Sequence, residues 1–221
     1  MNTFLTPSLH DYMLDVSLRE HSVLQALRTH TAQLSLARMQ IAPELAQFLQ
    51  FLIRLTRTQK ILELGTFTGY SALAMALALP DNGTLLTCDN NPEWTYHASK
   101  FWQQAGVADK ISLHLQPALI TLQELLAQDN HPYFDLIFID ADKANYCQYY
   151  EYALQLVSPT GMIAIDNIFW NGEVINQANI KGQTREIRKL NALLKEDSRV
   201  NTSLIPMGDG LFLIQPRVTH L

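Results

Sequence analysis

The sequence predicts an α/β domain built on a mostly parallel, seven-stranded sheet, with helices on both faces and an antiparallel strand at the C-terminal end. Two observations support this fold class. Short apolar segments, each bounded by turn or charged residues, alternate with segments whose apolar residues recur at helical spacing. Strands that alternate with helices imply right-handed crossovers and parallel pairing. The end of the chain instead carries two β-prone runs joined by a glycine-containing connection, which is typical of a hairpin.

The expected elements follow in order along the chain. A segment with a less regular pattern, about Leu9 to Leu36, should be helical, and a clearer helical face begins at Pro43. Five buried strands are predicted at Lys60–Leu64, Thr84–Asp89, Ile111–Leu115, Asp135–Asp140 and Met162–Asp166. Later helices are expected at Leu73–Leu77, Leu119–Leu126 and Thr184–Lys195. The hairpin is predicted at Thr202–Ile205 and Leu211–Ile214, with Gly208-Asp209-Gly210 between its strands.

Length and composition indicate one domain over residues 1–221, with an N-terminal helical segment over about 1–40. The chain has 48% apolar residues and a net charge of −5 without a basic run, so nucleic acid and anionic membranes are not expected partners. No apolar stretch approaches the length of a membrane span, and no signal peptide is expected. Cys88 and Cys147 are too few to staple this domain, which favours a cytoplasmic location.

A glycine-containing loop follows the first strand, in the run from Glu63 to Ser71. Ligands of open α/β sheets bind beyond the carboxyl ends of the strands, where glycine lets a ligand approach the backbone. Gly65 and Gly69 do not match the dinucleotide fingerprint, and no phosphate-binding lysine follows, so the loop suits a nucleoside without a pyrophosphate. Asp89 ends the second strand and could accept both ribose hydroxyls. Alternatively, the glycine-containing loop is a purely structural turn between strand and helix, and Asp89 is only a turn residue.

Acidic side chains also follow the fourth and fifth strands. Asp140 and Lys143 come after the fourth, and Asp166-Asn167 after the fifth. If these strands are neighbours, their ends lie about 5 Å apart, so these oxygen donors would converge. Such donors select a hard cation, Mg²⁺ first, with Mn²⁺ or Ca²⁺ also possible. A phenol ionises only near pH 10; a cation would favour the phenolate, and Lys143 could accept the proton. Helix capping is the alternative for either acid alone.

With these residues assembled, the chain resembles the cation-dependent O-methyltransferases, the group that holds catechol and caffeoyl-coenzyme A O-methyltransferases. The resemblance runs from about Met39 to Pro216 and rests on four stretches: Leu62–Ser71, Phe134–Lys143, Asp166–Gly172 and Gly208–Gly210. It implies a Rossmann-like methyltransferase fold whose seventh strand is reversed. It also implies S-adenosyl-L-methionine as the methyl donor, a divalent cation, and transfer to a hydroxyl of a phenolic or catechol-like small molecule.

The resemblance implies a role for each candidate site residue. The metal ligands would be Asp140, Asp166 and Asn167, and the catalytic pair Lys143 and Asp140. The cofactor would be bound by Met39, Ile41, Glu63, Gly65, Tyr70, Ser71, Asp89, Ala118 and Asp140. Trp170 and Asp209 are the candidates for the acceptor side, where Trp170 either walls the aromatic substrate or packs inward. A homodimer is also expected.

Two other classes of function compete with this interpretation. A nicotinamide-dependent oxidoreductase is opposed by the missing third glycine and the terminal hairpin, and would leave the metal triad unused. A non-catalytic binding domain is opposed by the joint presence of Asp140, Lys143, Asp166 and Asn167. Metal chelation favours acceptors with adjacent hydroxyls, but the natural acceptor cannot be read from the sequence.

Overall fold

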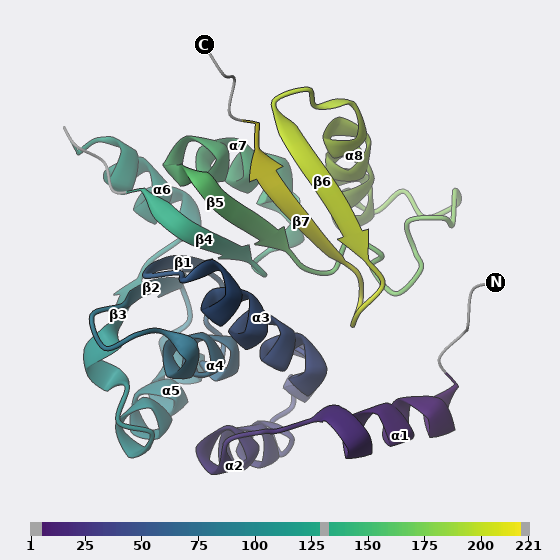
Figure 1. Ribbon diagram of the computed structural model, residues 1–221. Helices are drawn as coiled ribbons and strands as arrows, with labels where there is room; N and C mark the ends of the chain where they lie inside the picture. The colour runs from purple at the N-terminus through teal and green to yellow at the C-terminus, as the bar shows by residue number, and fades with distance from the viewer. Residues whose placement is uncertain (1–5, 129–132, 218–221) are drawn as a thin grey trace.

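The computed structural model describes residues 6–128 and 133–217, which form a seven-stranded sheet with helices on both faces (Figure 1). Its strands are β1 (Lys60–Leu64), β2 (Thr84–Asp89), β3 (Ile111–Leu115), β4 (Phe134–Ile139), β5 (Val157–Ile165), β6 (Val200–Ile205) and β7 (Leu211–Pro216). Their order across the sheet is β3-β2-β1-β4-β5-β7-β6. The pairs from β3 to β5 are parallel, whereas β7 runs antiparallel to both β5 and β6. The predicted fold class is confirmed.

Strand boundaries agree with the prediction for β1 to β3, whereas β6 begins two residues before the predicted Thr202 and β7 ends two residues after the predicted Ile214. The boundaries of β4 and β5 also differ. β4 begins at Phe134 and ends at Ile139, and β5 begins at Val157, well before the predicted Met162. The sequence from Ser158 to Gly161 favours a turn, which is why a later start was predicted. In the structure the register between β4 and β5 shifts between Phe134 and Leu136, and this irregularity accommodates the early part of β5.

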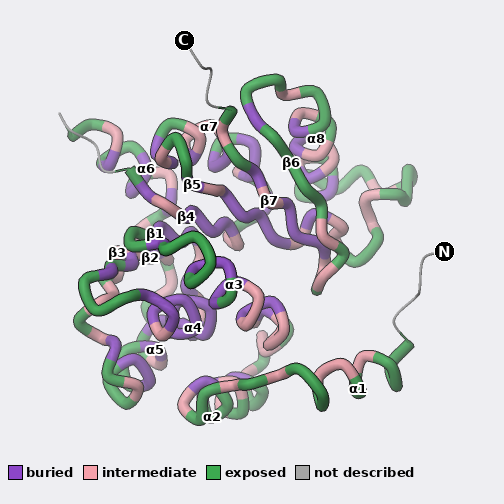
Figure 2. The backbone as a smooth tube through the Cα atoms, in the orientation of Figure 1, coloured by how far each residue is buried: buried purple, intermediate pink, exposed green. Residues whose placement is uncertain are grey.

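Two apolar layers sandwich the sheet. α3 (Pro43–Thr56), α4 (Tyr70–Ala78) and α5 (Pro92–Gln104) cover one face, and α6 (Ala118–Leu126), α7 (Tyr146–Leu156) and α8 (Gly182–Glu196) the other. Successive residues of a strand point to opposite faces, so Ile61 packs in the first layer and Leu62 in the second. The buried strands of Figure 2 are therefore apolar on both sides, as expected for a parallel sheet covered by helices.

The N-terminal segment, predicted to be helical, forms two separate helices. α1 (Pro7–Ser17) has no buried residue, whereas α2 (Ser22–Thr31) buries Leu24 and Leu27 against the first layer. α1 extends along the outside of the molecule (Figures 1 and 2). Gln47 on α3 holds the stretch between the two helices, accepting from the Arg19 backbone N–H at 2.6 Å and donating to the Ser17 carbonyl at 2.9 Å. The predicted segment began at residue 1, and residues 1–5 lie outside the described range.

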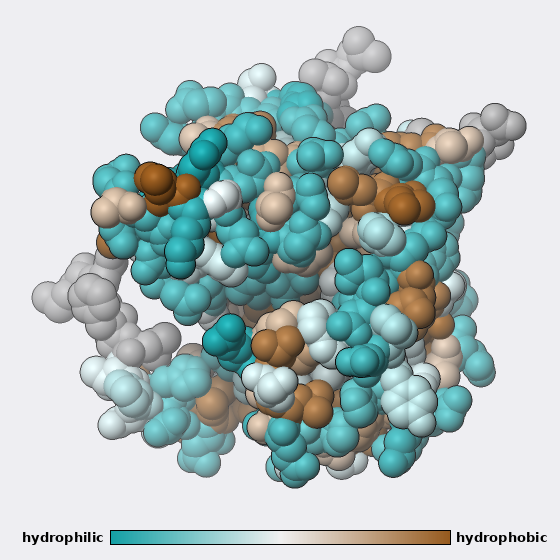
Figure 3. Space-filling view, turned by 180° about the vertical axis from the view of Figure 1, so that it is seen from behind, coloured by the Kyte–Doolittle hydropathy of each residue, from teal (hydrophilic) through white to brown (hydrophobic). Residues whose placement is uncertain are grey.

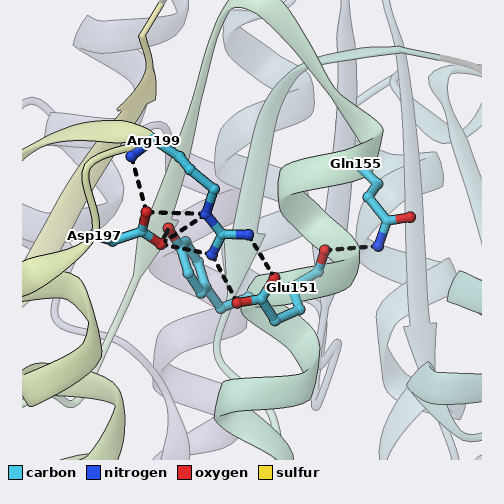
Figure 4. A network of polar contacts seen from close by, with 5 residues as sticks. Glu151, Gln155, Asp197 and Arg199 are labelled. Carbon is cyan, nitrogen blue, oxygen red and sulfur yellow. Dashed lines mark hydrogen bonds and ion pairs between the residues drawn. The ribbon is translucent and has the colours of Figure 1, made fainter.

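A polar network ties the edge strand β6 to α7 (Figure 4). Arg199, just before β6, lies 2.6 Å from Asp197 and 2.8 Å from Glu151 on α7. Tyr150 donates its hydroxyl to Asp197 at 2.8 Å. Since half of the Arg199 side chain is exposed, solvent screens these pairs, and each contributes at most about 1 kcal/mol.

The face opposite to that of Figure 1 is mostly hydrophilic. Seen from behind, hydrophilic residues cover most of the molecule, and hydrophobic residues form small separate groups (Figure 3). Within residues 6–128 and 133–217, every helix is too short or too polar to span a bilayer.

Candidate active site

A cavity of about 800 Å³ opens at the carboxyl ends of the central strands, where ligands of α/β sheets bind. It brings together nearly all of the predicted site residues. Those on its wall are Met39, Ile41, Gly65, Tyr70, Ser71, Asp89, Ala118, Asp140, Lys143, Asp166, Asn167, Trp170 and Asp209. Glu63 is the exception: it is fully buried in β1, beneath the cavity.

The glycine loop, residues 65–71, comprises the connection from β1 to α4 and the first two residues of α4. Gly65 has φ +98°, and a Cβ atom there would lie 2.0 Å from the carbonyl oxygen of Asp140, so only glycine allows this approach of the two strand ends. The backbone N–H groups of Thr66 and Phe67 donate to one carboxylate oxygen of Asp89, at 3.1 and 2.8 Å. The other oxygen accepts from Asn91. The loop therefore fixes the orientation of the carboxylate predicted to bind a ribose.

Glu63 supplies a carboxyl group in the protein interior. Thr87 donates its hydroxyl to Glu63 Oε2 at 2.6 Å, while Oε1 is buried and makes no hydrogen bond of good geometry in the described part of the chain, although the Ser71 hydroxyl is near the carboxyl group. Burial raises the pKa of Glu63 to about 8. Such a carboxyl oxygen beneath the cavity suits a cationic group, such as an ammonium, in the ligand above it.

The ends of β4 and β5 deliver the acids that the sequence singled out. Ile139 pairs with Ile165, and the backbone N–H of Asp166 donates to the Ile139 carbonyl at 3.0 Å, so the two strand ends are neighbours as predicted. Lys143 is buried, and its Nζ lies 2.9 Å from Asp140 Oδ1. The same Nζ donates to the Ala141 carbonyl at 3.0 Å.

The carboxylates at this edge repel one another. Burial raises the pKa of Asp166 well above its ordinary value, and the charge of Asp140 adds to the rise. Burial also raises the pKa of Asp209. A cation between Asp140 and Asp166 would relieve this repulsion, and their oxygens, with the amide of Asn167, form a donor set that suits a hard cation. Among the described residues no three His, Cys, Asp or Glu side chains could hold a metal by themselves, so Asn167 would have to contribute.

The loop after β5 forms the outer wall of the cavity. Asn167, Trp170 and Asn171 all adopt positive φ, between 51° and 61°, which is uncommon for residues other than glycine. Asp209 holds this loop, accepting from the backbone N–H of Asn171 at 2.8 Å. Gly210, with φ +85°, leaves room for the ring of Phe169, which an added Cβ would meet at 2.7 Å. Strained backbone held by its surroundings is a common property of binding sites.

Trp170 has a cavity on one side and apolar neighbours on the other. It lines the central cavity and packs partly against the second apolar layer, with Lys143 Nζ 5.8 Å from its ring centroid. It also lines a second cavity of about 610 Å³ on the far side of the loop. Trp170 thus lines both cavities.

Sequence reasoning missed Arg188, which shapes this loop from α8. Its guanidinium donates to four backbone carbonyls, those of Glu173, Val174, Asn176 and Asn179. No local pattern marks a single arginine on a helix for this role, because the converging carbonyls exist only once the loop has folded. Asp142 and Gln183, which also line the cavity, carry no sequence signal beyond their neighbours.

Comparison with known proteins agrees with this geometry. The sequence profile described as O-methyltransferase matches residues 14–217. The chain belongs to the O-methyltransferase family. It is 46% identical to "Catechol O-methyltransferase domain-containing protein 1" of Mus musculus, covering 93% of this chain and 78% of that protein. It is 41% identical to "Caffeoyl-CoA O-methyltransferase 1" of Zea mays, covering 93% and 83%.

Solved structures of O-methyltransferases also resemble this chain. The O-methyltransferase TomG from Streptomyces achromogenes, in complex with SAM, aligns with a TM-score of 0.87 at 27% identity, covering 96% of both chains. An O-methyltransferase from Bacillus cereus, in complex with SAH, aligns with a TM-score of 0.86 at 28% identity, covering 95% of this chain and 97% of that one. The chain is accordingly an S-adenosylmethionine-dependent O-methyltransferase.

Proposed function

We propose that this O-methyltransferase transfers the methyl group of S-adenosylmethionine to a phenolic hydroxyl of a small, catechol-like molecule, assisted by a divalent cation. The observation that carries the proposal is the convergence of Asp140, Lys143 and Asp166 at one edge of the cavity, beside the glycine loop. The names of its relatives support catechol and caffeoyl-CoA as the acceptor classes to test first.

The cofactor would occupy the half of the cavity formed by the glycine loop. Asp89, oriented by two loop N–H groups, would accept the ribose hydroxyls. Glu63 Oε1, which makes no hydrogen bond of good geometry with the described residues, would accept a hydrogen bond from the methionine ammonium. Met39, Ile41 and Ala118 would cover the rest of the nucleoside.

The acceptor would occupy the other half, between Lys143 and Trp170. A divalent cation, when bound by Asp140, Asp166 and Asn167, supplies positive charge that favours the ionised form of a phenol, with Mg²⁺ the first choice. Lys143, in its amine form, would accept the phenolic proton. The phenolate oxygen would then form a bond to the methyl carbon as the carbon–sulfur bond breaks, which leaves a neutral thioether. Asp209 would hold the loop that walls the aromatic ring.

Replacing Asp166 tests the metal assignment. Asp166→Ala should abolish metal-dependent turnover of a catechol and leave the dissociation constant for S-adenosylmethionine within about threefold, because Asp166 faces the acceptor half. A matched control is Asp135→Ala on the opposite end of the neighbouring strand, where the carboxylate caps the N–H groups of Gln59 and Lys60. The control should lower stability but keep turnover per folded molecule. An Asp166 variant with full, metal-dependent turnover would remove the assignment.

We further propose that the enzyme is a cytoplasmic homodimer. Exposed apolar side chains on α1 and α3, namely Tyr12, Val16, Phe51 and Leu55, support a protein-covered surface there. The free, buried thiols of Cys88 and Cys147 support a reducing compartment. Light scattering of the purified chain tests the assembly, and a monomer at micromolar concentration would overturn the dimer.

A further inference from the structure

The N-terminal segment reaches the glycine loop through a buried hydroxyl. Tyr70, only 2% exposed, donates its hydroxyl to Glu20 Oε1 at 2.6 Å. Arg28 on α2 donates two hydrogen bonds to the same carboxylate. Its Nε lies 2.9 Å from Oε1 and its Nη2 lies 2.7 Å from Oε2. Burial and the neighbouring Glu20 raise the pKa of Tyr70, so its hydroxyl remains a donor at neutral pH. The contact joins residues fifty positions apart.

A second contact joins the same two parts of the chain independently. Thr31, at the end of α2, shares a hydrogen bond of 2.9 Å with Thr68 in the glycine loop, and both side chains are at most 1% exposed. Two hydroxyl groups this deeply buried depend on each other, because neither can reach water.

Both contacts lie next to a residue with a strained backbone, Phe67. Phe67 adopts φ +48°, a conformation that costs a residue other than glycine free energy and persists only when its surroundings hold it. Thr68 and Tyr70 lie just after this strained residue, and Phe67 itself donates its N–H to Asp89. The contacts with α2 therefore lie next to the part of the loop that holds Asp89, the carboxylate proposed to bind the ribose.

We propose that Glu20, Arg28 and Thr31 are positioning residues that hold the glycine loop in its cofactor-binding shape, so that docking of the N-terminal segment sets the affinity for S-adenosylmethionine. Within the part of the chain that the structure describes, none of these three residues lines the cavity. The inference rests on the proposed assignment of this cavity to the cofactor.

Calorimetric titration of the full-length protein with S-adenosylmethionine tests this proposal. Tyr70→Phe removes only the hydroxyl and should raise the dissociation constant about three- to tenfold, as should Glu20→Ala and Thr31→Val. Glu20→Gln keeps an acceptor for Tyr70 and should recover part of the affinity. Because Glu20 and Tyr70 form one network, the double variant should lose little more than the worse single variant. Turnover of Glu20→Ala and Thr31→Val at saturating cofactor should change less than about twofold, since neither residue lines the cavity.

A matched control separates this role from general support. Gln47→Ala removes two hydrogen bonds to the same N-terminal segment, at Arg19 and Ser17, without touching the glycine loop. It should leave cofactor affinity within about twofold of the wild type. Wild-type affinity in Tyr70→Phe and Glu20→Ala would overturn the inference, and so would an equal loss in Gln47→Ala. A wild-type protein that binds no S-adenosylmethionine would instead overturn the proposed cofactor site itself.

Discussion

Glu63 makes the stability of the cofactor-free enzyme depend on pH in a definite direction. Burial raises its pKa from 4.5 to about 8, so between these values the folded state keeps a proton that the unfolded state has released. The stabilisation is fully present below the unfolded pKa and is lost as the pH rises through 8. One pKa unit corresponds to about 1.36 kcal/mol, so the free energy of unfolding should fall by roughly 3 kcal/mol between about pH 5.5 and pH 8.5.

The substitution Glu63→Gln isolates this effect. Glutamine keeps the volume and still offers an oxygen to the Thr87 hydroxyl, but it cannot ionise. Urea unfolding of the cofactor-free proteins should give similar free energies of unfolding at pH 5.5 and a variant more stable by roughly 3 kcal/mol at pH 8.5. A difference between variant and wild type that does not change with pH would refute the reasoning.

Three further predictions concern the acceptor side and the sheet edge. Lys143→Ala should lower turnover of a catechol at neutral pH about a hundredfold and recover partly above pH 9, where the phenol ionises unaided; a pH profile parallel to that of the wild type would contradict a role as base. Arg188→Met removes four hydrogen bonds to loop carbonyls, so steady-state kinetics should show an acceptor KM raised several-fold, with calorimetry showing unchanged cofactor affinity. Arg199→Ala should lower the free energy of unfolding by about 1 kcal/mol at neutral pH. Because Arg199 lowers the pKa of Asp197, this stabilisation exists above the unfolded pKa near 4 and is lost in acid, so urea unfolding of variant and wild type should converge at low pH.

The features predicted from sequence are those with local causes. The periodicity of apolar residues gave β1 to β3 with their observed boundaries, and the acids at strand ends were located because parallel strands end at one edge. Gly65 was predicted to let a ligand approach the backbone; the structure adds a reason that the sequence does not contain, the close approach of the Asp140 carbonyl. These inferences need only the strand order and the period of the side chains.

The features that were missed depend on contacts between distant parts of the chain. Glu20 and Tyr70 meet only after α2 has packed against the first apolar layer, and Arg188 finds its carbonyl partners only after the loop has folded. The break between α1 and α2 was hidden by an irregular pattern that has no glycine or proline to mark it. The sequence predicted a cofactor contact for Glu63 but could not show that β1 buries this side chain fully, hydrogen-bonded to Thr87 on the neighbouring strand.

Methyl transfer from S-adenosylmethionine to a simple catechol, with Mg²⁺ and then with a chelator, tests the proposed function most directly. We predict methylated product with Mg²⁺ and, after chelation, a rate lower by at least about a hundredfold that is restored when the metal is added back. Undiminished product in the presence of chelator would contradict the role assigned to Asp140, Asp166 and Asn167.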